Sequence, residues 1–171
     1  PKPESFSGGL SSVLIAVGKN RATQQEEILL TKRTMLVESH KGQVSFPGGF
    51  WETHDPSLLD TALRESHEEI GANPSDVQIL GGLAPVLTHQ GVTIVPYVGR
   101  LDFPYPFLLN PAEVEKVLFL PLSQLMEDGL KTVSISVGSA RVMSLGIQVD
   151  GELVWGATAR MLGQLRESLL R

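Results

Sequence analysis

The chain has 171 residues, of which 42% are hydrophobic and 19% charged, a composition typical of a folded globular protein and not of a disordered one. It contains no cysteine, which excludes disulfides, thiolate catalysis and zinc–thiolate sites. The net charge of −5 argues against a general nucleic-acid-binding surface, because such a surface carries a basic patch or stripe. An acidic protein that binds an anionic substrate needs a bound metal ion or a local cluster of Lys and Arg.

The apolar stretches of the sequence are short. The longest, such as 10–17, contain far fewer residues than a membrane-spanning helix needs. No basic segment precedes an apolar run at the start of the chain, so we expect no signal peptide. A cytoplasmic location fits these observations.

Apolar runs bounded by turn residues predict a protein with more strands than helices. The segments expected to be extended are 10–17, 27–31, 42–46, 77–87, 92–101, 117–120, 140–149 and 152–155. Asp150-Gly151, between the last two, is a strong signal for a hairpin turn. A short helix is expected over 122–127 and an amphipathic one over 158–170. The pattern predicts one α/β domain, 1–171, with a mixed sheet between helices.

One further helix is expected in the middle of the chain. It is predicted to start at Asp55-Pro56, because Asp is a favoured N-cap and Pro is favoured at the first helical position. Gly71 is the expected C-cap. The residues expected on the buried side are Leu59, Ala62, Leu63, Ser66 and Ile70.

The last two turns of this helix carry three glutamates. Glu65, Glu68 and Glu69 are spaced i, i+3 and i+4, so their carboxylates lie on one face and repel one another. Mg²⁺ binds through a few carboxylates, waters and substrate phosphates, and would turn this repulsion into a site. The alternative is a solvated helix face on which Arg64 pairs with Glu68. A preceding Gly48-Gly49, whose backbone can approach a phosphate or offer a carbonyl to a metal, favours the metal site.

This segment resembles the Nudix box, G-x5-E-x7-R-E-U-x-E-E-x-G-U, in which U is a bulky apolar residue. Gly49 matches its first glycine, and the stretch from Arg64 to Ala72 matches its distal half. The spacing from Gly49 to Arg64 is one residue longer than in the general pattern, and Asp55 stands at the Glu position. Ser66 and Ala72 occupy positions that are usually apolar. The longer spacing is similar to that of the Nudix branch that hydrolyses coenzyme A and its derivatives.

That branch has a second signature upstream, L-L-T-x-x-R-S-x3-R-x3-G-x3-F-P-G-G. The chain matches it at both ends, in residues 29–34 and in Gly42 with residues 46–49. Glu38 occupies the second arginine position, where a glutamate would repel a phosphate that an arginine could contact. This departure bears on the substrate and not on the metal chemistry. Other segments that look like landmarks of the branch are 94–99, 110–114, 120–122 and 155–159.

The resemblance implies an α/β/α sandwich with a central mixed β-sheet, and metal-dependent hydrolysis of a pyrophosphate bond in a nucleoside diphosphate derivative. With coenzyme A or an acyl-CoA as substrate, the products would be 4′-phosphopantetheine and adenosine 3′,5′-bisphosphate. Glu65 and Glu69 would be the principal ligands of Mg²⁺ or Mn²⁺, with Glu68 and the Gly49 carbonyl completing the shell. Arg64 would orient a glutamate instead of contacting the substrate.

The resemblance also implies an acidic residue, from a later loop, that joins the metal site or acts as a base. Glu113 is the candidate and Glu115 its competitor, while an ordinary exposed glutamate is the alternative for either. The base that accepts the proton of the attacking water would be Glu65, Glu68 or Glu113.

Substrate contacts are expected from residues near the glycine-rich loop. Arg33, Lys32 and Lys41 are the candidates to meet phosphates, and Gly48 can approach the substrate closely. His40 lies near the expected substrate entrance, with an ordinary surface role as the alternative. No pair among the four histidines has a recognisable zinc spacing.

Two other functions fit the same residues. One is a Nudix hydrolase of another substrate, such as ADP-ribose, a nucleotide sugar or a nucleoside triphosphate. The other is a catalytically silent Nudix domain that senses a ligand, although such a domain need not keep all three helix glutamates. The expected partner is a small molecule that contains a pyrophosphate, with no nucleic acid and no membrane. The sequence leaves open whether the chain forms a homodimer.

Overall fold

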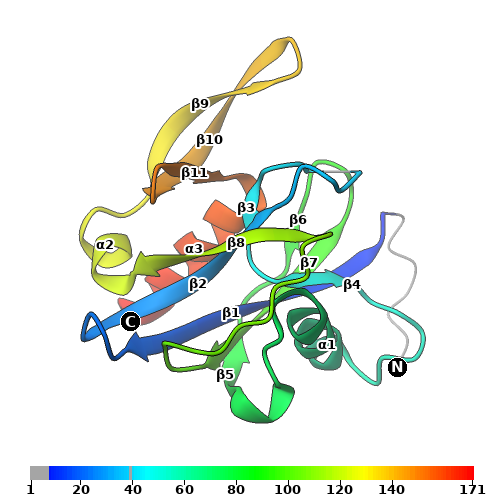
Figure 1. The fold of residues 1–171 in the computed structure, drawn as a ribbon. Helices are drawn as coiled ribbons and strands as arrows, with labels where there is room; N and C mark the ends of the chain where they lie inside the picture. The colour runs from blue at the N-terminus through cyan, green and yellow to red at the C-terminus, as the bar shows by residue number, and fades with distance from the viewer. Residues whose placement is uncertain (1–7, 39) are drawn as a thin grey trace.

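The computed structural model describes residues 8–38 and 40–171 and contains one large mixed sheet with helices on its faces (Figure 1). The strands follow the order β3-β2-β1-β7-β5, with β4 paired to β1, β6 to β7 and β8 to β2. β1 and β7 are parallel, and the other pairs are antiparallel. The strands of this sheet are β1 (Leu10–Asn20), β2 (Gln25–Arg33), β3 (Val44–Ser45), β4 (Gly48–Phe50), β5 (Gln78–Gly82), β6 (Val86–Leu87), β7 (Thr93–Arg100) and β8 (Val114–Pro121).

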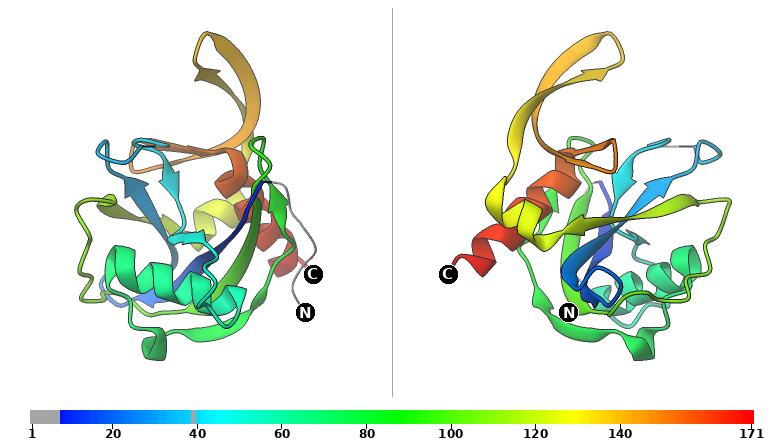
Figure 2. Two further views of the ribbon diagram at one scale, coloured as in Figure 1. Left: turned by 90° about the vertical axis from the view of Figure 1, so that its right-hand side faces the viewer. Right: turned by 60° about the vertical axis from the view of Figure 1, so that its left-hand side comes forward.

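The remaining elements are helices and a second sheet. The helices are α1 (Leu58–Ile70), the 3₁₀ turn η1 (Pro74–Asp76), α2 (Leu122–Glu127) and α3 (Gly156–Leu169). The second sheet has the order β11-β10-β9 and consists of β9 (Lys131–Val137), β10 (Ala140–Val149) and β11 (Glu152–Trp155). The β9–β10 hairpin of this sheet projects from the body of the molecule in every view, whereas β11 lies against the body (Figures 1 and 2).

The two faces of the large sheet bury different helices (Figures 1 and 2). Successive side chains of a strand point to opposite faces, and β1 shows the result. Val13 and Ile15 lie in the core cluster that contains Leu162 of α3, whereas Leu14 lies in the cluster that contains Ala62 of α1. The predicted α/β/α sandwich with a central mixed sheet is therefore confirmed.

Helix α1 begins later than the sequence predicts. Its N-cap is Ser57, whose Oγ accepts a hydrogen bond from a backbone N–H of the first turn at 3.2 Å. The prediction that Asp55 caps the helix is wrong, because the Asp55 carboxylate is held instead by Arg64. Gly71 is confirmed as the C-cap: it adopts φ +70°, a left-handed conformation that glycine reaches without strain. The cap matters for the site because α1 carries the three glutamates.

The later elements follow the prediction more closely. α2, β10 and β11 have the expected bounds. Asp150 and Gly151 both have positive φ, as a type I′ hairpin turn requires. The segment expected as one strand over 77–87 is divided into β5 and β6, and two strands, β4 and β9, were not expected. β4 is three residues long and begins with two glycines, so it has no alternation to detect.

No helix among the described residues is long and apolar enough to cross a membrane. Residues 1–7 and 39 lie outside the description, and the assignment of 1–171 to one domain stays a prediction.

Candidate metal-binding active site

The glycine-rich loop lies directly against the glutamate face of α1. The backbone N–H of Gly48 points toward Oε2 of Glu69 at 3.4 Å. A Cβ added to Gly49 would lie 2.5 Å from Cδ of Glu65, so any side chain at this position would collide with that carboxylate. Glycine at position 49 is therefore required by the close approach of the loop to the helix.

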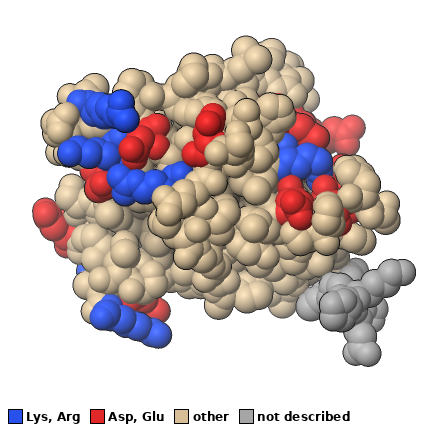
Figure 3. Space-filling view, turned by 90° about the horizontal axis from the view of Figure 1, so that it is seen from below, with Lys and Arg blue, Asp and Glu red and all other residues tan. Residues whose placement is uncertain are grey.

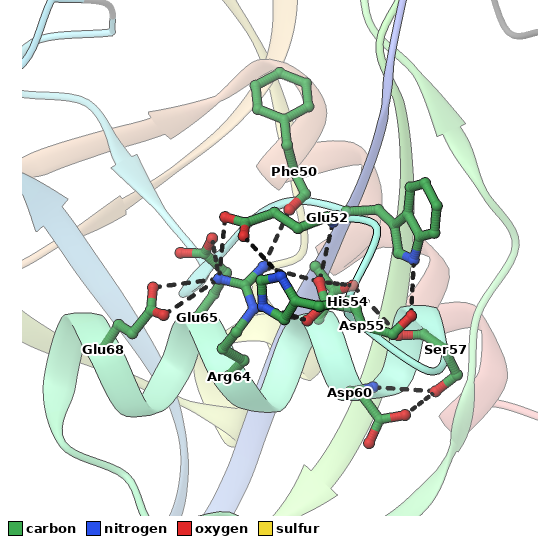
Figure 4. Close-up of polar contacts among 11 residues, drawn as sticks. Phe50, Glu52, His54, Asp55, Ser57, Asp60, Arg64, Glu65 and Glu68 are labelled. Carbon is green, nitrogen blue, oxygen red and sulfur yellow. Dashed lines mark hydrogen bonds and ion pairs between the residues drawn. The ribbon is translucent and has the colours of Figure 1, made fainter.

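Arg64 joins the loop to the helix (Figure 4). Its guanidinium donates two hydrogen bonds to Asp55, with Nε–Oδ1 at 2.8 Å and Nη2–Oδ2 at 2.9 Å. It also donates to the backbone oxygen of Phe50 at 3.2 Å. Hydrogen bonds from Arg64 hold the pKa of the buried Asp55 carboxyl well below its usual range. This bidentate pair fixes the loop over the first half of α1.

The same guanidinium contacts two of the helix glutamates. Nη1 of Arg64 lies 3.1 Å from Oε1 of Glu65 and 3.3 Å from both carboxylate oxygens of Glu68. The Glu68 side chain is half exposed, whereas that of Glu65 is largely buried. Arg64 is thus occupied by protein carboxylates, the arrangement expected of a residue that orients a glutamate.

Glu69 is the most deeply buried of the three glutamates, at 6% exposure. Burial, and then the nearby carboxylates of Glu65 and Glu113, raise its pKa to about 8. Burial also raises the pKa of Glu65, with Glu68 and Glu113 adding to the rise and Arg64 opposing it. The neighbouring carboxylates are therefore close enough to disfavour the ionisation of Glu65 and Glu69, and a cation among them would relieve the repulsion.

Glu113 reaches this group from the turn directly before β8. Its backbone oxygen accepts a hydrogen bond from the N–H of Thr34, at the end of β2, at 3.0 Å. Its Oε2 is buried and has no hydrogen-bond partner among the described residues. The competitor Glu115 instead lies 3.5 Å from Nζ of Lys32 and is half exposed. Of the two candidates, the structure brings only Glu113 to the helix glutamates.

The residues present fit a divalent metal ion. A buried carboxylate oxygen without a partner is costly, and a metal ligated by Glu113 would satisfy it. The Gly49 carbonyl faces Ser11, whose Oγ donates a hydrogen bond to it at 2.9 Å, and Gly49 pairs with Ser12 in the β1–β4 ladder. In the described ranges, no three acidic or histidine side chains are arranged so that they could hold a metal ion by themselves, so further donors such as water and substrate oxygens would be needed. An open set of oxygen donors suits Mg²⁺, which keeps several of its waters.

The predicted phosphate-binding cations lie in different surroundings. Nζ of Lys32 is 2.7 Å from Oε1 of Glu152 in β11, so this lysine is already paired. Arg33 is the next residue along β2, so its side chain faces the opposite side of the sheet from that of Lys32. The charge of Arg33 lowers the pKa of Glu69, so Arg33 lies near the glutamates. Its Nε is buried without a hydrogen-bond partner among the residues described. Lys41 is exposed, and so is His40, whose Nδ1 lies 3.2 Å from Oε1 of Gln43.

On the face shown in Figure 3, basic side chains lie next to acidic ones and do not form a separate stripe. Among the predicted phosphate-binding cations, Arg33 is the one whose charge acts on Glu69.

Sequence reasoning missed one contributor to the site. Ser11 lies in the apolar strand β1 and holds the carbonyl of Gly49 in place. Nothing in its sequence context marks it, because a single serine in a buried strand is common. Only the pairing of β4 with β1, in which Ser12 lies opposite Gly49, brings Ser11 to the loop.

Comparison with known proteins agrees with this geometry. The family described as "NUDIX domain" matches residues 12–137, nearly three quarters of the chain. The chain belongs to the Nudix family. It is 36% identical over 143 residues to the Nudix hydrolase NudL of Photorhabdus laumondii, covering 83% of this chain and 76% of that protein. It is 31% identical to NudL of Yersinia enterocolitica, covering 99% of this chain and 87% of that protein.

Solved Nudix structures share the fold. The Nudix hydrolase RenU of M. smegmatis superposes with a TM-score of 0.64 at 16% identity, covering 95% of this chain and 86% of that chain. The Nudix domain of Shewanella oneidensis NrtR, solved with ADP ribose, gives a TM-score of 0.63 at 20% identity and covers 99% and 94%. The family match and the NudL relatives confirm the predicted enzyme class, a Nudix pyrophosphohydrolase. Nudix hydrolases generally use divalent metal ions, in agreement with the donor set described above.

Proposed function

We propose that this Nudix protein hydrolyses the pyrophosphate bond of coenzyme A or an acyl-CoA, giving adenosine 3′,5′-bisphosphate together with 4′-phosphopantetheine from coenzyme A or acyl-4′-phosphopantetheine from an acyl-CoA. The observation that supports metal-dependent chemistry is the meeting of Glu65, Glu69 and Glu113 behind the Gly48-Gly49 loop. The preference for coenzyme A rests on the similarity of residues 29–49 to the upstream signature of that branch.

Glu65 and Glu69 would hold Mg²⁺ or Mn²⁺, with Glu68 and the Gly49 carbonyl as further donors. When bound, the metal would neutralise charge on the pyrophosphate and lower the pKa of a coordinated water. Glu68, which is half exposed, has the weakest structural support among these ligands.

Glu113 is the proposed proton acceptor for the attacking water. Its Oε2 is buried and free, whereas Glu65 and Glu68 both receive hydrogen bonds from Arg64. Glu113→Gln is expected to lower kcat about 10²- to 10⁴-fold, the usual contribution of a general base. If metal affinity falls instead and kcat recovers at high Mg²⁺, Glu113 is a ligand and not the base.

Arg33 is the proposed contact to the substrate phosphates. Arg33→Ala should raise KM more than Lys32→Ala, because Lys32 is held by Glu152 while Arg33 lies beside the glutamates. Equal effects of the two changes would contradict this assignment. Lys41, His40 and the backbone of Gly48 are the remaining proposed contacts.

The substrate is tested with a panel of coenzyme A, an acyl-CoA and ADP-ribose, each with Mg²⁺ and with Mn²⁺, and with the products identified by mass spectrometry. Formation of 4′-phosphopantetheine supports the proposal. Glu38→Arg restores the arginine of the branch at an exposed position and should lower KM for coenzyme A but not for ADP-ribose.

The second candidate function is hydrolysis of ADP-ribose or a related nucleotide. The similarity in fold to a Nudix domain solved with ADP ribose supports it. Turnover of ADP-ribose without turnover of coenzyme A would select it. Binding of either ligand without any turnover would indicate the third candidate, a ligand-sensing module. A cytoplasmic location is part of the proposal, whereas oligomeric state is inferred separately below.

A further inference from the structure

The β9–β10 hairpin, residues 131–146, forms an arm that extends beyond the body of the molecule (Figures 1 and 2). β9 is the terminal strand of its sheet, and no other described strand pairs with its outer edge. Seven residues of extended chain give this edge a length of about 23 Å. An edge of this kind presents backbone N–H and C=O groups that another strand can pair with.

The edge lacks the features that normally prevent strand pairing. β9 contains no proline, and Lys131, its first residue, is its only charged one. Its register with β10 is continuous, so no bulge twists the edge away. The edge is therefore open to pairing along its whole length.

One face of the arm is apolar and partly exposed, although Ile135 in its middle is only 7% exposed. Val133, Ile135 and Val137 alternate along β9, and Val142 of β10 lies opposite Ile135. Val137 is 49% exposed and Val142 40% exposed. A partner that pairs with β9 in register would extend this apolar face instead of leaving it at an edge.

The charge of the arm is opposite in sign to that of the rest of the chain. The chain has 14 Lys and Arg and 19 Asp and Glu, and the arm holds two of these cations, Lys131 and Arg141, and no anion. The rest of the chain therefore carries −7. Two bodies in direct contact would repel each other. Antiparallel pairing of two arms instead places the bodies at opposite ends of the joined sheet and directs the cationic tip of each arm, with Arg141, toward the acidic body of the other copy.

We propose that two copies of the chain pair through their β9 edges, antiparallel, with Ser134 on the twofold axis. This register pairs all seven residues of both strands. It sets Val133 opposite Ile135 of the second copy, so the apolar side chains stay on one face. Lys131 lies opposite Val137 of the second copy, and the two lysines are about 20 Å apart, at opposite ends of the pairing. The two arms form one six-stranded sheet.

The register can be tested with single cysteines, because the chain has none of its own. Ser134→Cys places two thiols directly opposite each other, about 4.5–5.5 Å apart between Cα atoms, within the range of a disulfide. Ser136→Cys is the matched control. Its side chain is equally exposed, but the two copies of residue 136 are offset by about 13 Å along the strands.

Under mild oxidation, Ser134→Cys should form a covalent dimer and Ser136→Cys should not. Sedimentation of the unchanged protein should give about 37 kDa, twice the chain mass of 18.5 kDa. Ser134→Lys should give the monomer, because two ammonium groups would face each other, while Ser134→Thr should keep the dimer.

Circular dichroism and a thermal melt would verify that each variant is folded. A wild-type protein that stays monomeric at about 100 µM, a concentration on the order of the dissociation constant of a weak transient dimer, would overturn the proposal. A dimer that survives Ser134→Lys, or equal cross-linking of the two cysteine variants, would also overturn it. None of these results depends on which substrate the site hydrolyses.

Discussion

Replacement of Glu69 by Gln should stabilise the metal-free protein at high pH. The pKa of Glu69 rises from the usual 4.5 to about 8 on folding, mainly because the carboxyl group is buried. The native state then binds the Glu69 proton more tightly than the unfolded state does. Between these two pKa values the free energy of unfolding therefore falls as pH rises. Glutamine has no proton to lose and removes this dependence.

The size of the effect follows from the same two pKa values. One pKa unit corresponds to about 1.36 kcal/mol, so the ionised carboxylate costs about 3 kcal/mol at pH 7 and up to about 5 kcal/mol at pH 9. Below pH 4.5 the carboxyl group is neutral in both states and the cost disappears. The stability advantage of Glu69→Gln is therefore expected to grow from pH 4.5 to about pH 8 and to level off above that pH.

Urea unfolding in the presence of a chelator at pH 5, 7 and 9 measures this difference. Glu167→Gln, an exposed change on α3, serves as the control and should stay within about 0.5 kcal/mol of the unchanged protein. Glu69→Gln should also abolish turnover. A variant that is less stable than the unchanged protein at pH 9, or whose advantage does not change with pH, would refute the reasoning. Turnover that persists at saturating Mg²⁺ would refute the assignment of Glu69 as a ligand.

Metal binding should displace the proton of Glu69. At pH 7 a carboxyl group with a pKa of about 8 is mostly protonated, and a metal binds only its ionised form. Calorimetric titration with Mg²⁺ in two buffers of different ionisation enthalpy should show release of close to one proton at pH 7 and much less at pH 9. Equal heats in the two buffers at pH 7 would contradict the prediction.

Two further changes test how the loop and helix are held together. Gly49→Ala should lower kcat/KM by about 100-fold, because the added Cβ would lie 2.5 Å from Cδ of Glu65 and displace it. Gly82→Ala, where the nearest atom would be 3.6 Å away, should leave activity unchanged, and similar losses in both would rule out the steric argument. Arg64→Ala should reduce the free energy of unfolding by about 3 kcal/mol, because it leaves the buried Asp55 carboxylate without its partner. Chemical denaturation measures this loss, and a change below about 1 kcal/mol would show that the pair does not hold the loop.

The sequence alone determined the local parts of this protein. Helix α1 with its three glutamates, its Gly71 cap and the Asp150-Gly151 turn all follow from spacing and from the conformations that individual residues allow. These features depend on residues close together in the chain, so their physics is contained in a short stretch of sequence. The start of α1 was misplaced because Asp55 has two uses, as a helix cap and as a partner for Arg64. A contact nine residues away decided between them.

Only the tertiary structure decided which distant residues join the glutamates. Glu113 is 44 residues beyond Glu69, and the pairing of β8 with β2 is what brings it there. The register of β2 likewise separates two adjacent cations: Arg33 points toward Glu69, and Lys32 points to the opposite face, where Glu152 holds it. Because a strand alternates its side chains between two faces, neighbours in sequence take different roles once the sheet fixes which face covers the site.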